Sequence, residues 1–329
     1  MAKFHLNDLL FNLTQAQKNL LFAIGILGYL TVDQAGLIVA RHVQFSSRDK
    51  TSRRLLDDLV KQKLLLKIQT KFRALTAYVL ANDGVPIAEC LAPGCHFTAG
   101  TKPVLQGELF LHRQVSQAYI VNRMGEAMAY RQRDPDCIQT IFLTEYLRFA
   151  TDACRRIKPR NPNQNIKMTT GIHFNQLKSS SGGRWPDGII LYEAWEDDLP
   201  DANKNQYHFE WVEGERGDKK RIDYANAIAA SWHLQQSEIK PFLGGYANIG
   251  TTEVATVNCT FVIADWAAKV IVPRIVNAAC DLLDREGTKI ERHLQQLKVK
   301  TVPLSESTFM LQDRPFHTFH YYNEQFLKE

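Results

Sequence analysis

The stretch from Gly182 to Lys220 decides the fold, and it reads GGRWPDGIILYEAWEDDLPDANKNQYHFEWVEGERGDKK. A Pro-Asp-Gly sequence leads into one apolar run, and a polar insert separates this run from a second one that ends in glutamates and cations. Short apolar runs bounded by turn-forming residues are typical of buried strands. We therefore predict two neighbouring strands of a mixed sheet, with acidic side chains at one end.

Three carboxylates are expected to meet at that end. Pro186 fixes its own φ angle and keeps Trp185 extended, which places Asp187 at the mouth of the first strand. Glu213 and Glu215 are two residues apart, so both point to one face of the second strand, while Glu210 points to the other. If the strands pair, Asp187, Glu213 and Glu215 offer the hard oxygen ligands that Mg²⁺ or Mn²⁺ prefers. The alternative is a solvated strand end whose acidic residues have no common role.

Further candidates surround these acids. Lys219 and Lys220 follow the second strand and can stabilise negative charge on a phosphate. Glu145 lies in the first turn of a helix that we expect from Thr144 to about residue 157. Tyr224, on a helix expected over 221–234, is interpreted as a packing or phosphate-contacting residue rather than a covalent nucleophile.

The N-terminal region predicts three helices, over 14–28, 31–39 and 46–62, and then two strands, over 64–68 and 75–80. This order is the layout of a winged helix-turn-helix, whose third helix enters the major groove of DNA. Ser46 and Ser47 are the expected N-caps of that helix. The candidate DNA-binding residues on the third helix and in the wing are Arg48, Lys50, Ser52, Arg53, Arg54, Lys71 and Arg73. A solvated basic surface and a protein-docking module are the alternatives.

The chain has 329 residues, enough for more than one domain. We predict a winged helix-turn-helix domain over 1–92, a helical connector over 93–135 and a catalytic domain over 136–329. The connector contains a helix expected over 109–128, in which His112 is interpreted as a structural residue. A strand over 255–264, a helix over 268–283 and an edge strand over 297–302 complete the last domain. The aromatic segment 316–327 either packs on the core or stacks on single-stranded bases.

The acidic pattern resembles the PD-(D/E)xK restriction-endonuclease-like fold, in which an acidic pair on the second strand follows an aspartate. This chain departs from that pattern because no lysine stands two residues after Glu213. Over residues 10–225 the chain also resembles the replication-relaxation family of plasmid proteins, and within it the mobilisation relaxases of the MobC and TraX type. Residues 186–188 match the Pro-Asp-Gly of that family, and residues 212–217 match its Glu-x-Asp-Arg-Gly stretch with Glu215 in place of the aspartate.

Composition excludes several other classes. Hydrophobic residues make up 45% of the chain and charged residues 23%, as in a water-soluble globular protein, and the net charge of +5 permits nucleic-acid binding. No apolar run reaches the length of a membrane span and no signal sequence is visible, so we expect a cytoplasmic protein without membrane insertion. The six cysteines are scattered, as expected of reduced thiols. No P-loop, GxSxG or GxGxxG sequence is present.

The sequence therefore predicts an α/β (α+β) protein with an N-terminal winged helix-turn-helix and a restriction-endonuclease-like mixed-sheet domain. The resemblance implies a metal-dependent relaxase that nicks a plasmid origin of transfer, acting on double-stranded and locally single-stranded DNA. A mobilisation coupling ATPase or an accessory protein is a candidate partner. The alternative is a non-enzymatic DNA-binding accessory or replication regulator that uses the nuclease-like domain as a scaffold.

Overall fold

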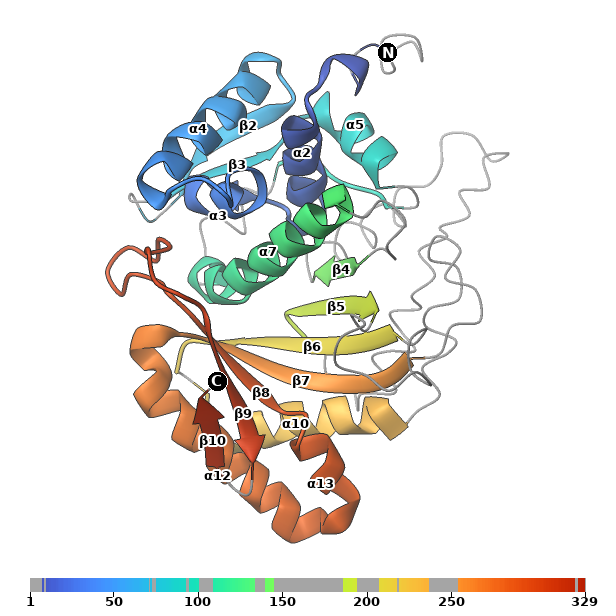
Figure 1. Cartoon of the computed structure of the whole chain (residues 1–329), viewed down its shortest axis with the longest axis vertical. Coiled ribbons are helices and arrows are strands. Elements are labelled where there is room, and N and C mark those ends of the chain that lie inside the picture. The colour runs from blue at the N-terminus through green and yellow to red at the C-terminus, as the bar shows by residue number, and fades with distance from the viewer. Residues whose placement is uncertain are drawn as a thin grey trace. The chain divides into compact units, whose positions relative to one another are not determined.

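The computed structural model describes residues 8, 10–70, 72, 75–92, 95–100, 109–133, 140–144, 186–193, 207–217, 219–236, 254–322 and 325–328. It is a mixed α/β structure with two sheets (Figure 1), which confirms the predicted class. The chain divides into two compact units. Unit 1 comprises Met1–Phe110, Val121–Pro135 and Leu143–Thr170, and unit 2 comprises Leu111–Ile120, Asp136–Phe142 and Gly171–Glu329.

The described residues of unit 1 form helices and one small sheet. Its elements are α2 (Gln15–Leu27), β1 (Leu30–Thr31), α3 (Val32–Val39), α4 (Phe45–Lys61), β2 (Leu65–Gln69), β3 (Thr76–Leu80) and α5 (Gly84–Leu91). The strands lie in the order β1-β3-β2, and both pairings are antiparallel. The three predicted helices and two predicted strands are therefore present, and β1 adds a short third strand.

Local capping explains where these helices begin and end. A capping box between Thr14 and Gln17 begins α2, and Gly28, with a φ of 83°, ends it in the left-handed conformation that favours glycine. The predicted caps of the third helix are wrong: α4 begins at Phe45, so Ser46 and Ser47 lie inside its first turn. Helix α5 follows the second strand of this sheet and was not predicted.

Apart from the last two residues of β4, which belong to unit 1, unit 2 contains the larger sheet, with strand order β10-β9-β8-β7-β6-β5-β4. Its strands are β4 (Ile141–Thr144), β5 (Gly188–Glu193), β6 (Tyr207–Glu215), β7 (Val254–Ala264), β8 (Lys298–Val302), β9 (His317–Tyr322) and β10 (Gln325–Lys328). The pairs β6–β7 and β7–β8 are parallel, whereas β5–β6, β8–β9 and β9–β10 are antiparallel. The predicted mixed sheet is confirmed. Strand β8 is not the expected edge strand, because the aromatic C-terminal segment adds β9 and β10 beyond it.

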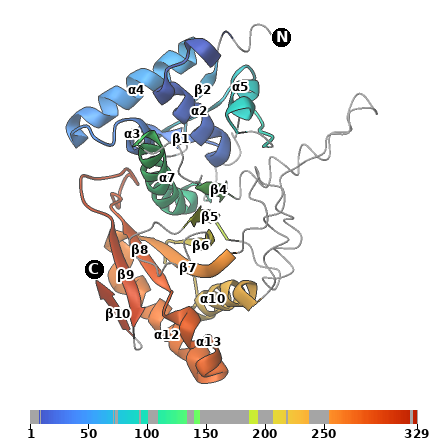
Figure 2. The same cartoon turned by 45° about the vertical axis from the view of Figure 1, so that its right-hand side comes forward.

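Helices cover both faces of this sheet. Helices α10 (Arg221–Gln236) and α12 (Ala268–Glu286) pack together on one face, with α13 (Thr288–Leu294) against α12 (Figure 1, Figure 2). The short helix η3 (Asp265–Ala267) joins β7 to α12. On the other face, Tyr119 of α7 (Leu109–Arg133) donates a hydrogen bond to the buried Glu210, 2.7 Å away. Among the described residues, no helix is long and apolar enough to cross a membrane.

Candidate active site

Strand pairing brings the predicted carboxylates to one end of the sheet. Strand β5 runs antiparallel to β6, with Gly188 opposite Val212. The residue before β5, Asp187, therefore lies beside the last residues of β6, which include Glu213 and Glu215. Both glutamates are buried, and both belong to the face of β6 that carries Trp211. The predicted pairing of the two strands is confirmed.

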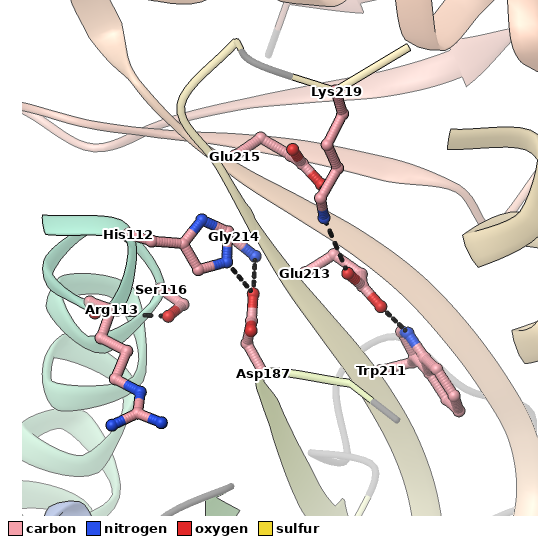
Figure 3. A network of polar contacts seen from close by, with 9 residues as sticks. All are labelled: His112, Arg113, Ser116, Asp187, Trp211, Glu213, Gly214, Glu215 and Lys219. Carbon is pink, nitrogen blue, oxygen red and sulfur yellow. Dashed lines mark hydrogen bonds and ion pairs between the residues drawn. The ribbon is translucent and has the colours of Figure 1, made fainter. Parts of the chain in front are cut away.

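Asp187 is held by two partners of different kinds. Its Oδ2 accepts a hydrogen bond from the backbone N–H of Gly214 at 2.7 Å and lies 3.1 Å from Nε2 of His112 (Figure 3). Burial would raise the pKa of Asp187, but the hydrogen bond and charge of His112 and the charge of Lys219 hold it below its ordinary value. Burial would lower the pKa of His112, but Asp187 outweighs it and raises that pKa. The two residues therefore favour a charged pair.

Lys219 binds the other two carboxylates. Its ammonium lies 3.3 Å from Oε2 of Glu213 and also forms an ion pair with Oε1 of Glu215 (Figure 3). The second oxygen of Glu213 accepts a hydrogen bond from the indole N–H of Trp211 at 2.8 Å. Burial lowers the pKa of Lys219, but the two glutamates outweigh it and raise the pKa to about 12. Lys219 is therefore a fixed positive charge inside the acidic cluster.

Glu215 is the least satisfied member of this cluster. Its Oε2 is buried and has no hydrogen-bond partner among the described residues. Burial raises the pKa of Glu215 to about 7, with the charges of Glu213 and Asp187 adding to the rise and Lys219 opposing it. A bound cation, or a proton on Glu215 itself, would satisfy this buried oxygen.

A turn after β6 explains how Lys219 reaches this position. Gly217 has a φ of 103°, which favours glycine, and its carbonyl accepts a hydrogen bond from Arg274 at 2.8 Å. Lys219 stands two residues after this glycine, and its ammonium reaches both glutamates. The neighbouring Lys220 is exposed, and its backbone N–H donates to Asp223 at the start of α10. Of the two candidate lysines, the structure brings Lys219 into the cluster and leaves Lys220 at the surface.

The remaining predicted site residues are divided between surface, core and undescribed positions. On α4, Lys50, Arg53 and Arg54 are exposed. Arg48 is half-buried with its guanidinium 5.4 Å from the centre of the Phe45 ring. Ser52, also a predicted DNA-binding residue, is fully buried, and its hydroxyl donates a hydrogen bond to the carbonyl of Arg48. Three predicted residues lie outside the described part of the chain: Glu145, Lys71 and Arg73.

His112 is the functional candidate that sequence reasoning missed. Its apolar neighbours led to the structural interpretation, yet its side chain reaches Asp187. The available signal was its spacing from Ser116, since residues four apart share one face of a helix. Ser116 is buried against Gly214, where a Cβ would lie only 2.8 Å from the Cβ of Ser116. Glycine at 214 therefore allows α7 to approach β6 closely enough for the His112 contact.

The carboxylates of this cluster are suitable ligands for a hard cation, but they are not arranged around a common metal position. Carboxylates are the ligands that Mg²⁺ and Mn²⁺ prefer, and Glu215 has an open buried oxygen. Across the described ranges, however, no group of three or more His, Cys, Asp or Glu side chains is arranged to hold a metal ion. The ammonium of Lys219 neutralises the two glutamates instead.

No family model, curated protein or solved structure matches this chain.

Proposed function

We propose that unit 2 is a metal-dependent DNA endonuclease of the PD-(D/E)xK kind. The observation that carries this proposal is the contact of Lys219 with both Glu213 and Glu215. The restriction-endonuclease-like pattern has a lysine two residues after the second acid, and Lys219 supplies that cation from the next turn. A nuclease site requires acids and a cation together, and a solvated strand end does not bury them.

The roles follow from the contacts. Asp187, Glu213 and Glu215 are the residues that would hold Mg²⁺ or Mn²⁺, which when bound lowers the pKa of a water and offsets phosphate charge. His112 and the N–H of Gly214 fix the orientation of the Asp187 carboxylate. Lys219 offsets negative charge that develops on a phosphate beside the glutamates.

We further propose that unit 1 is a winged helix-turn-helix that presents α4 to double-stranded DNA. The exposed cations Lys50, Arg53 and Arg54 support this role, because cations early in the third helix of that fold face the groove. The resemblance of residues 10–225 to the replication-relaxation family suggests a plasmid origin of transfer as the target. A nick there would start mobilisation.

Nicking of supercoiled origin DNA tests the nuclease. With Mg²⁺ or Mn²⁺ the protein should convert supercoils to open circles, and Asp187→Asn should lower the rate at least about 100-fold. The matched control is Asp284→Asn on the exposed surface of α12, which should nick at the wild-type rate. Equal activity of wild type and Asp187→Asn, or no nicking by either, would rule out the enzyme.

The second candidate is a non-enzymatic DNA-binding accessory or replication regulator. It is favoured by the exposed cations Lys50, Arg53 and Arg54 of α4, which can bind phosphates without any catalytic step. A salt-dependent footprint without nicking would support it. Arg53→Ala should then weaken duplex binding and reduce the steepness of log K plotted against log salt concentration by about 1. The control Arg285→Ala, which changes an exposed residue of unit 2, should alter neither quantity.

A further inference from the structure

An exposed aromatic and apolar surface lies at the start of α12. Trp266 of η3 is 38% exposed and Val270 of α12 is 56% exposed. Lys269 between them is also exposed. An exposed aromatic ring beside a cation can bind a ligand that is both flat and negatively charged. We call Trp266, Lys269 and Val270 the Trp266 surface.

A neighbouring loop holds the indole in place. The ring of Phe309 meets Trp266 edge-on, with 6.2 Å between ring centres and an interplanar angle of 87°. Phe309 has a φ of 55°, which is rare for a bulky residue, and its N–H donates to the carbonyl of Ser305 at 2.8 Å. Arg314 of the same loop forms a 2.7 Å ion pair with Asp265, the residue before Trp266. A positioned aromatic ring loses little conformational freedom when a ligand stacks on it.

The Trp266 surface belongs to the same end of the sheet as the acidic cluster. Strands β6 and β7 are parallel, with Glu215 beside Ile263. Strand β7 ends at Ala264, so Trp266 follows only three residues after the neighbour of Glu215. The exposed Lys220, on the segment that follows β6, adds a second cation at this end.

We infer that the Trp266 surface binds an unpaired nucleobase of a single DNA strand, next to the acidic cluster. Every base has a π-face that can stack on an aromatic side chain, and cations such as Lys269 attract the phosphate backbone. Paired bases inside a duplex have both faces covered, so the surface selects a locally open strand. This inference rests on the proposed nuclease function and names the form of its substrate.

Binding of short single strands to the full-length chain tests it. The probe is a dye-labelled oligothymidylate containing one 2-aminopurine, with EDTA present so that no cleavage occurs. Trp266→Leu should weaken binding about 5- to 100-fold and abolish the quenching of 2-aminopurine, whereas Trp266→Phe should keep most of both. Phe11→Leu is the matched control, because it removes an aromatic that is 88% exposed in unit 1.

The outcomes separate this inference from the nuclease proposal. Loss of affinity and quenching in Trp266→Leu alone, with an unchanged midpoint of thermal unfolding, supports the Trp266 surface whether or not the protein nicks DNA. Equal binding by wild type and Trp266→Leu overturns the inference even if Asp187 proves essential for nicking. Self-association that Trp266→Leu abolishes, with single-strand affinity unchanged, would also overturn it and assign the surface to a protein partner.

Discussion

Lys219 shows how a single residue decides the character of the acidic cluster. Its ammonium is the shared partner of Glu213 and Glu215, both of which are buried. Removing one partner of a buried ion pair leaves a desolvated charge behind, which costs more than the pair itself contributes. The stability of unit 2 should therefore depend on Lys219 and not on the exposed Lys220.

Lys219→Met should lower the free energy of unfolding by about 2 to 4 kcal/mol at pH 8. The loss should be smaller at pH 5, because Glu215, whose pKa is about 7, is protonated there and needs no cation. Urea unfolding at the two pH values measures both effects. The control Lys220→Met changes an exposed lysine and should stay within about 0.5 kcal/mol of wild type. Equal losses in the two variants would contradict the assigned contacts.

His293 provides a second test away from the cluster. It is buried, shares a 2.8 Å hydrogen bond with Ser231, and burial lowers its pKa from 6.5 to about 4. The unfolded chain therefore binds more protons between these values. The stability contributed by neutral His293 is complete above pH 6.5 and is lost as pH falls toward 4, by about 3 kcal/mol.

His293→Gln should flatten this part of the pH dependence, because glutamine can donate to Ser231 but does not titrate. Urea unfolding from pH 4.5 to 7.5 gives the slope of the free energy of unfolding against pH. His233→Gln changes an exposed histidine of α10 and should keep the wild-type slope. A wild-type slope in His293→Gln would mean that another group titrates.

At the scale of elements, the contact of α7 with β6 sets the geometry around Asp187. Tyr119 of α7 and Thr260 of β7 both donate to the buried Glu210, at 2.7 and 2.8 Å. Glu210 lies on the opposite face of β6 from Glu213, as strand alternation predicted. The acids of β6 therefore have two roles: Glu210 connects helix and sheet, and the other two form the cluster.

Gly214→Ala should destabilise unit 2 by about 1 to 3 kcal/mol, because its Cβ would lie 2.8 Å from that of Ser116. It should also displace His112 from Asp187. Thermal unfolding measures the first effect, and the NMR titration of His112 measures the second. Ser116→Gly removes the opposing Cβ, so the double variant should recover part of the loss. Additive losses would show that the two side chains do not collide.

At the scale of the whole molecule, α7 contributes to both units. Its residues 111–120 belong to unit 2, whereas residues 109–110 and 121–133 belong to unit 1. Within unit 1, Arg41 binds Asn122 at 2.9 Å and Glu126 at 2.7 Å. Gly125 lies against the carbonyl of Leu37, where a Cβ would be only 2.2 Å away. The C-terminal part of α7 is therefore part of the unit 1 core.

A fragment of residues 1–92 should consequently unfold at a lower temperature than one of residues 1–135, because it lacks the partners of Arg41. Circular dichroism melting of both fragments measures the difference. In the longer fragment, Glu126→Ala should lower the midpoint toward that of the shorter one. Identical midpoints for the two fragments would place the boundary of the folded unit at residue 92.

Patterns of residues close together in the sequence predicted many of the helices and strands. The helix predicted over 14–28 matches α2, and Pro186 placed Asp187 directly before β5. The alternation of Glu210, Glu213 and Glu215 gave the two faces of β6. These features depend on residues within a few positions of each other, so the chain alone specifies them. The start of α4 was misplaced because serines favour cap positions, yet here they lie in the first turn.

Only the tertiary structure decided which side chains meet. His112 and Asp187 are 75 residues apart, and their contact depends on a glycine at 214 that no local pattern connects with them. The sequence by itself determined two paired strands with acids at one end and a helical N-terminal region bearing cations. The tertiary structure decided that Lys219, not Lys220, enters the cluster, that Ser52 is buried and that β8 lies inside the sheet. Periodicity and capping act through neighbouring residues, whereas burial and ion pairing depend on how distant segments pack.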